Sequence, residues 1–498
     1  MPREIDHAEL LNTALREHAE QRLSWLRDPA RPPQLGSAAQ WLFSPEGWEC
    51  LQQAIRDRRY SAAELDRLPD ALAELARERA RRTGRAWLST FLQQRLAVGS
   101  TQRVPARVLA PWIEPVQSSH SASGPSEALR ALGGALEPHV VRLIELREQA
   151  LHEEQAWRDK LAKLLPQPNP PEPTGEPAPA VETTAELAAR WLERTDDAWR
   201  ELARWLIRHS ELPSTENELA RVLVGLRAFA LDGLASPDRR FYRLALGARK
   251  LGFERDMTSR MRGENAPALL VPAPVCLALS TPSDVRVMQP DLEYGVLSDV
   301  SVAQGLGEGL ALALVSPAVP TLLRRPLGHG ASVSAALGGL FAQLRADSAY
   351  LRRVDGFERE AAERAARCGA LWTLMRTRLT AALTLAGAAP ARSTSERVER
   401  LSTAGEQALG RSVPAGLMAL SLLAEDSVER QFLALHWGFG LHGLLRERFD
   451  QDFYLNPRLS EVVRGAAARG AAIDAPALAA ELGARGTPAL DRLFELLR

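Results

Sequence analysis

The sequence predicts a mainly α-helical protein with one small β-sheet. Apolar residues recur every three or four positions along most of the chain, whereas β-favouring runs gather in one stretch and prolines in a few others. The helical period is clearest where one stripe contains Leu187, Trp191, Ala198, Leu202 and Trp205. Such a stripe is most often core packing, so we expect a long helix here with its tryptophans buried.

Prolines divide the chain into parts. Residues Pro166 to Ala180 read PQPNPPEPTGEPAPA, which excludes a helix or a central strand because proline lacks a backbone donor and fixes φ. We therefore expect an N-terminal helical region over residues 1–165, a linker or exposed loop over 166–181, and a larger helical domain over 182–498. Small and polar residues from Gly387 to Ser395 predict a joint between two long helices.

The β signal lies between Ala268 and Met288. The runs ALLVPAPVCLAL and DVRVM favour extended structure and are punctuated by Pro272, Pro274 and Pro282. We expect these runs to form a small sheet beside the helical body.

Charge balance excludes some classes of partner. Lys and Arg together number 62, and Asp and Glu also number 62, so no overall field attracts nucleic acid or an anionic membrane surface. The most apolar stretch, Val300 to Val319, is interrupted by Gln304 and Glu308, so no membrane span is expected. A peptide or protein partner remains possible, and it must be recognised locally.

The cysteines and the N-terminus indicate a cytoplasmic protein. Cys50, Cys276 and Cys368 are far apart and odd in number, which favours a reducing compartment. The opening MPREIDHAELL carries charged residues where a secretory signal needs an apolar run.

One glycine-rich segment is unusual. From Asp299 to Leu314 the chain reads as a buried helix, yet it contains Gly305, Gly307 and Gly309. Each glycine costs about 1 kcal/mol relative to alanine inside a helix. A reason other than helix propensity must keep these glycines there.

The surroundings of this segment resemble the thimet oligopeptidase and oligoendopeptidase F group of zinc metallopeptidases. Pro282, Asp284, Val285 and Arg286 precede it as a P-x-D-V-R stretch precedes the family's H-E-x-G-H-A helix. Two further stretches match in order, LGHGASVSAALGGLFAQLRADSAYLRR and HWGFGLHGLLRERFDQDFYLNPRL. The resemblance covers residues 228–498 and implies a large helical peptidase scaffold with the sheet beside the metal helix.

The residues that would bind zinc are replaced. The resemblance places Gln304 at the first histidine, Gly305 at the general base and Glu308 at the second histidine. The third ligand, a glutamate, falls at Ala335, or at Ala336 if the gap is placed differently. Two imidazoles at i and i+4 bind zinc on one helix face, and an amide with one carboxylate does not replace them.

We therefore interpret the chain as a non-catalytic relative without a zinc cofactor, which holds a peptide or a protein in the former substrate groove. No intact H-E-x-x-H occurs in the sequence. Candidates for the groove are Arg286, His329, His436 and Tyr454.

Two other functions compete with this interpretation. The chain could be an atypical hydrolase with a remodelled site that uses Glu308, His329 or Tyr454. Alternatively, Gly305, Gly307 and Gly309 could form a loop that cradles a nucleotide. Leu310 stands where the last glycine of that fingerprint belongs, which disfavours the nucleotide.

Overall fold

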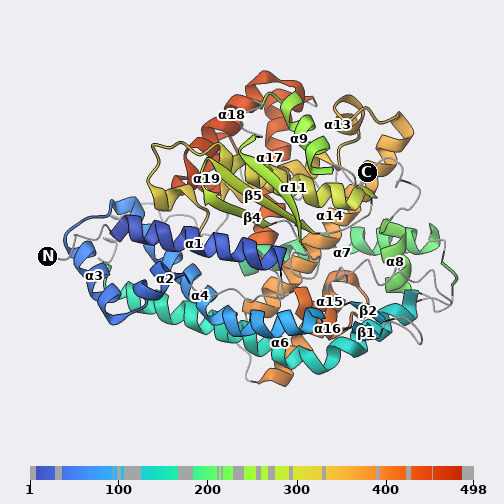
Figure 1. The fold of residues 1–498 in the computed structure, drawn as a ribbon. Coiled ribbons are helices and arrows are strands. Elements are labelled where there is room, and N and C mark those ends of the chain that lie inside the picture. The colour runs from blue at the N-terminus through green and yellow to red at the C-terminus, as the bar shows by residue number, and fades with distance from the viewer. Residues whose placement is uncertain are drawn as a thin grey trace, which may run out of the picture.

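Figure 1 shows the computed structural model, a helical body around a small sheet. The prediction of a mainly helical scaffold with a small sheet beside the glycine-rich helix is confirmed. The structure describes residues 7–28, 36–93, 95–97, 103–105, 125–165, 183–209, 212–214, 217–227, 231, 240–253, 259–266, 275–290, 295–327, 332–388, 393–421, 428–450 and 452–484.

The N-terminal region is built from long helices. Its elements are α1 (His7–Arg27), α2 (Ser37–Leu42), α3 (Pro45–Arg56), α4 (Ala62–Gln93), β1 (Arg95–Ala97), β2 (Arg103–Pro105) and α6 (Pro125–Ala162). Helices α4 and α6 pack side by side, and α1 lies between them and the larger sheet (Figure 1). Arg27 at the end of α1 bonds through Nε to Glu264 in that sheet at 2.6 Å. The expected linker, 166–181, lies outside the described residues, and the domain boundaries stay a prediction.

Helices dominate the rest of the chain. They are α7 (Thr184–His209), α8 (Glu218–Arg227), α9 (Arg240–Lys250), α11 (Gly295–Ala313), α12 (Val333–Leu344), α13 (Ser348–Arg353), α14 (Arg359–Ala388), α15 (Thr394–Leu409), α16 (Ala415–Ser421), α17 (Val428–Phe449), α18 (Pro457–Ala468) and α19 (Ala475–Glu481), with short 3-10 turns at η3 (Thr321–Arg324), η4 (Phe453–Leu455) and η5 (Gly470–Ala472). The predicted tryptophan helix is α7, where Trp191 is buried. The predicted joint separates α14 from α15.

The larger sheet has the strand order β3–β5–β4, from β3 (Met261–Ala266), β4 (Val275–Ser280) and β5 (Asp284–Pro290). Strand β5 runs parallel to β3 and antiparallel to β4, so Val285 pairs with Met261 on one side and with Ala278 on the other. The sequence predicted β4 and β5. It missed β3, whose residues MRGENA are too polar to stand out.

Helix α11 lies against the sheet on one side and against α12 on the other. A Cβ atom added to Gly309 would lie 2.7 Å from Val287 of β5, and one added to Gly307 would lie 2.6 Å from the carbonyl oxygen of Leu337 in α12. Both distances are shorter than side chains allow. Close packing on two faces is therefore the reason that these glycines occur inside a helix, at the cost in propensity noted above.

Glycines also bring α12 and α17 together. A Cβ atom at Gly339 would overlap the carbonyl oxygen of Ala434, and one at Gly438 would overlap the backbone of Gly339. The two helices thus meet backbone to backbone, and α12 is held between α11 and α17.

A buried ion cluster joins α9, α11 and the end of α12. Asp299 on α11 is 0% exposed. Its carboxylate lies 3.0 Å from Nε of Arg240, 2.8 Å from Nη2 of Arg243 and 3.3 Å from Nη2 of Arg345. Arg345 also pairs with Asp355. Because charges removed from water need close partners, this cluster fixes the first half of α11 in place.

Within the described ranges, no helix is both long enough and apolar enough to cross a membrane.

Candidate functional site

The candidate site is the face of α11 that carries Gln304 and Glu308. These residues are one helical turn apart and therefore share a face, and each is only 4% exposed. Opposite them on α12 lies Gly338, where an added Cβ atom would be 3.3 Å from Cβ of Glu308 and 3.5 Å from Cγ of Gln304. Ala335, one turn earlier on α12, is also buried.

A guanidinium group from α14 binds Gln304. Nη1 of Arg376 donates to Oε1 of Gln304 at 3.1 Å. Arg376 is 8% exposed, and burial lowers the pKa of its guanidinium to about 10. The group is therefore still protonated at neutral pH, and a positive charge rests against the amide.

A second guanidinium group, from α17, binds Glu308. Nη2 of Arg430 donates to Oε1 of Glu308, and both side chains are largely buried. Guanidinium and carboxylate form strong, charge-assisted hydrogen bonds, so Glu308 is engaged as the partner of a cation. The face of α11 that carries Gln304 and Glu308 thus faces two arginines.

These side chains do not fit a zinc ion. Zinc takes lone pairs from imidazole, thiolate or carboxylate, usually from three or four protein ligands. Here the amide oxygen of Gln304 and the carboxylate of Glu308 already accept hydrogen bonds from Arg376 and Arg430. Across the ranges that the structure describes, no cluster of three or more His, Cys, Asp or Glu side chains could hold a metal. A divalent cation would also be repelled by the two guanidinium groups.

The nucleotide-loop alternative is wrong. Gly305, Gly307 and Gly309 lie inside the continuous helix α11, and Gly307 and Gly309 are covered by α12 and the sheet. Backbone amides inside a helix are already bonded to carbonyls and cannot cradle a phosphate. Gly307 and Gly309 serve packing.

Two of the predicted groove residues have partners of their own. Arg286 on β5 donates from Nε to Asp284 at 2.6 Å and from Nη1 to Glu264 at 2.7 Å, and the bond to Asp284 is the main cause of its raised pKa. Tyr454 is 0% exposed, its hydroxyl lies 3.5 Å from Oδ1 of Asp452, and burial raises its pKa.

The predicted histidines lie apart. His436 lies in the core of α17, where its Nδ1 accepts a hydrogen bond of 2.8 Å from Nε1 of Trp191. His329 falls outside the described residues. The roles of these residues in a groove stay predictions.

His436 makes stability depend on pH. Burial, and then the charge of Arg190, lower the pKa of His436 to about 3, so the folded protein keeps it neutral. The unfolded chain takes up a proton below about pH 6.5, and the folded chain does not. Stability therefore falls by about 1.4 kcal/mol per unit as pH drops from 6.5 towards 3, and the residue has no such effect above pH 6.5.

We expect His436→Gln to reduce this pH dependence. Between pH 6.5 and pH 5, the free energy of unfolding in urea should fall by about 2 kcal/mol less in the variant than in the native protein. His152→Gln is the control, because His152 is exposed. An equal pH dependence in the native protein and the His436 variant would contradict the buried, neutral state.

Sequence reasoning missed Arg376 and Arg430. A signal for Arg376 was present, since it and Arg378 interrupt the apolar stretch LWTLMRTRLTAAL on α14. An arginine in the middle of a buried helix needs a polar partner, which here is Gln304. Arg430 lies in a segment without an unusual pattern, and its partner Glu308 is 122 residues away.

Solved structures share this arrangement of helices and sheet. An oligoendopeptidase F matches at a TM-score of 0.58 with 10% identity, over 99% of this chain and 96% of that one. An oligoendopeptidase F from Bacillus anthracis matches at 0.53 with 10% identity, over 92% and 84%. A Pyrococcus furiosus carboxypeptidase matches at 0.50 with 11% identity, over 99% and 98%.

The fold is that of these peptidases. The predicted resemblance to oligoendopeptidase F is therefore confirmed at the level of the fold, and it extends over nearly the whole chain instead of residues 228–498 alone. No protein-family model matches the chain, and no curated protein matches it in sequence.

Proposed function

We propose that this protein is a non-catalytic member of the peptidase fold that binds a peptide or protein partner in the former substrate groove. The observation that carries the proposal is the pairing of Gln304 with Arg376 and of Glu308 with Arg430. The sequence resemblance implies that this face of α11 corresponds to the zinc-binding face of the oligopeptidases. Guanidinium groups now supply positive charge there, but they cannot activate a water molecule as a Lewis acid does.

The physical chemistry favours such a replacement. Loss of a metal ion from an intact ligand cage would leave buried carboxylates and imidazoles without partners, at several kcal/mol each. Arg430 compensates Glu308, and the small residues Gly338 and Ala335 leave no further buried charge on the facing helix. The pocket beside this face, described below, supports a retained binding role.

Metal analysis of the native protein is the direct test. After incubation with zinc and dialysis, we expect far less than one zinc ion per chain. We also expect no chelator-sensitive cleavage of short peptides. Stoichiometric zinc together with chelator-sensitive cleavage would overturn the proposal.

Restored ligands provide the matched control. A first variant combines four changes: Gln304→His, Gly305→Glu, Glu308→His and Ala335→Glu. A second variant adds Arg376→Met and Arg430→Met. We expect zinc binding in the second variant and much weaker binding in the first, because the arginines repel the ion. Equal affinities in two folded variants would contradict the role assigned to the arginines.

A further inference from the structure

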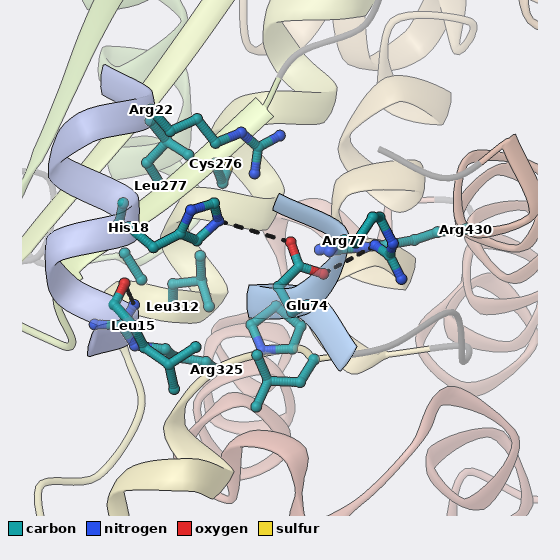
Figure 2. Close-up of a pocket in the computed structure, with 14 residues that line it drawn as sticks. Leu15, His18, Arg22, Glu74, Arg77, Cys276, Leu277, Leu312, Arg325 and Arg430 are labelled. Atoms are coloured by element: carbon teal, nitrogen blue, oxygen red, sulfur yellow. Dashed lines mark hydrogen bonds and ion pairs between the residues drawn. The ribbon is translucent and has the colours of Figure 1, made fainter. Parts of the chain in front are cut away.

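A cavity of about 80 Å³ lies beside the face of α11 that carries Gln304 and Glu308. Helices α1 and α4 form one wall, β4 and Leu312 of α11 form another, and Arg325 and Arg430 complete the lining (Figure 2). One water needs only about 10–15 Å³ of such volume, so the cavity has room for a small polar group. Arg430 both lines the cavity and binds Glu308, which places the cavity next to the candidate site.

The lining of this cavity, here called the basic pocket, carries more basic than acidic side chains. Four arginines and His18 line it against one lining carboxylate, that of Glu74, and the arginines are Arg22, Arg77, Arg325 and Arg430. Figure 2 shows His18 and Arg22 reaching from α1 towards α4, with Arg430 beside Arg77.

The acidic groups near the basic pocket are already engaged. Glu74 bonds to Arg77 at 2.9 Å and lies 3.8 Å from Nε2 of His18. Glu154 bonds to Nε of Arg77 at 2.6 Å. Burial alone would raise the pKa of Glu74, but Arg77 and then His18 lower it well below its usual value. These carboxylates offset the charge of Arg77, and Glu308 offsets that of Arg430, so Arg22 and Arg325 account for the excess of positive charge in the lining.

Arg325 carries a buried positive charge. Among the described residues, its hydrogen-bond acceptors are carbonyl groups. It is 9% exposed, and its Nη1 donates to the carbonyl oxygen of Leu15 at 3.1 Å and its Nη2 to that of Leu279 at 3.4 Å. Burial lowers its pKa to about 10, so the charge persists at neutral pH. Carbonyl dipoles stabilise a buried cation less well than an anion does.

We propose that the basic pocket binds an oxyanion, the carboxylate or phosphate group of a ligand. Guanidinium groups match both groups geometrically, and a site of low dielectric strengthens the attraction. This inference names the ligand chemistry of the binding site and so rests on the proposed function. Either a free phosphate or an acidic peptide side chain could supply the group.

Direct binding to the full-length native protein distinguishes the two sources. One calorimetric titration uses inorganic phosphate, and a second uses an acetylated and amidated tripeptide with a central aspartate, compared with the same peptide containing asparagine. We expect saturable binding of phosphate or of the aspartate peptide, and weak binding of the asparagine peptide. The absence of saturable binding in both titrations would overturn the inference.

Variants then locate the site. Arg22→Gln and Arg325→Met are expected to weaken binding at least roughly tenfold, since each removes a hydrogen bond from a charged donor. Arg324→Met is the matched control, because Arg324 directly precedes Arg325, also donates to carbonyls, and does not line the basic pocket. Unchanged affinity in the two folded pocket variants would overturn the inference.

A labelling experiment requires no change to the arginines. Cys276 lines the basic pocket and is partly exposed, so its modification by a thiol reagent reports on occupancy. With Cys50→Ser and Cys368→Ala in place, the bound anion should slow labelling of Cys276 at least threefold. Labelling at the same rate with and without saturating anion would show that the anion binds elsewhere. Zinc analysis and peptide-cleavage assays of the native protein test catalytic inactivity separately, so the two proposals can fail independently.

Discussion

Asp299→Asn is expected to destabilise the protein by about 3–5 kcal/mol, the usual cost of removing one partner from a buried ion cluster. The change preserves the shape of the side chain and removes its negative charge. Arg240, Arg243 and Arg345 would then share a buried site without the carboxylate that joins them. Because the cluster fixes α9 and the end of α12 to α11, the loss should affect global unfolding.

The measurement is urea unfolding followed by circular dichroism. Asp197→Asn is the control, since Asp197 is fully exposed and its Oδ1 lies 3.8 Å from Nη1 of Arg200, an arrangement that contributes little to stability because water screens it. Equal midpoints for Asp299→Asn and the native protein would show that the buried carboxylate contributes nothing.

Gly339→Ala is expected to destabilise the protein by about 3 kcal/mol, although alanine is the better helix former. The added methyl group would overlap the backbone of α17 at Ala434, so α12 and α17 would have to separate. Overpacking a close interface typically costs about 1–3 kcal/mol, and a backbone atom cannot move aside as a flexible side chain does.

Gly465→Ala is the matched control for Gly339→Ala. Gly465 lies in α18 with open space around the position of a Cβ atom, so the same substitution should stabilise the protein by up to about 1 kcal/mol. The two variants thus differ in the sign of the expected change in thermal midpoint. A stabilising effect at Gly339 would contradict the contact between α12 and α17.

Local sequence patterns predicted the helices and two strands, because the spacing of apolar residues in each element reflects the face that the element buries. The stripe containing Trp191 predicted α7, and β-branched residues predicted β5. Strand β3 was missed because its polar side chains are satisfied across the sheet: Glu264 bonds to Arg286, and Asn265 bonds to Gln289 at 2.6 Å. Such pairing depends on strand register, which no short stretch of sequence records.

The candidate site was predictable only in part, because its two halves come from distant segments. Comparison with a family motif identified Gln304 and Glu308 on one face of a helix. Their partners, Arg376 and Arg430, are 72 and 122 residues away along the chain. Only the packing of α14 and α17 brings these charges to α11.

The position of α1 has a consequence for shortened forms of the protein. His18 and Arg22 on α1 and Glu74 on α4 form one wall of the basic pocket, and the backbone of Leu15 accepts a hydrogen bond from Arg325. Truncation that begins the chain after α4 would strip this wall and leave Glu154 without Arg77. We therefore expect a chain that begins after α4 to present a different surface here from that of the intact chain.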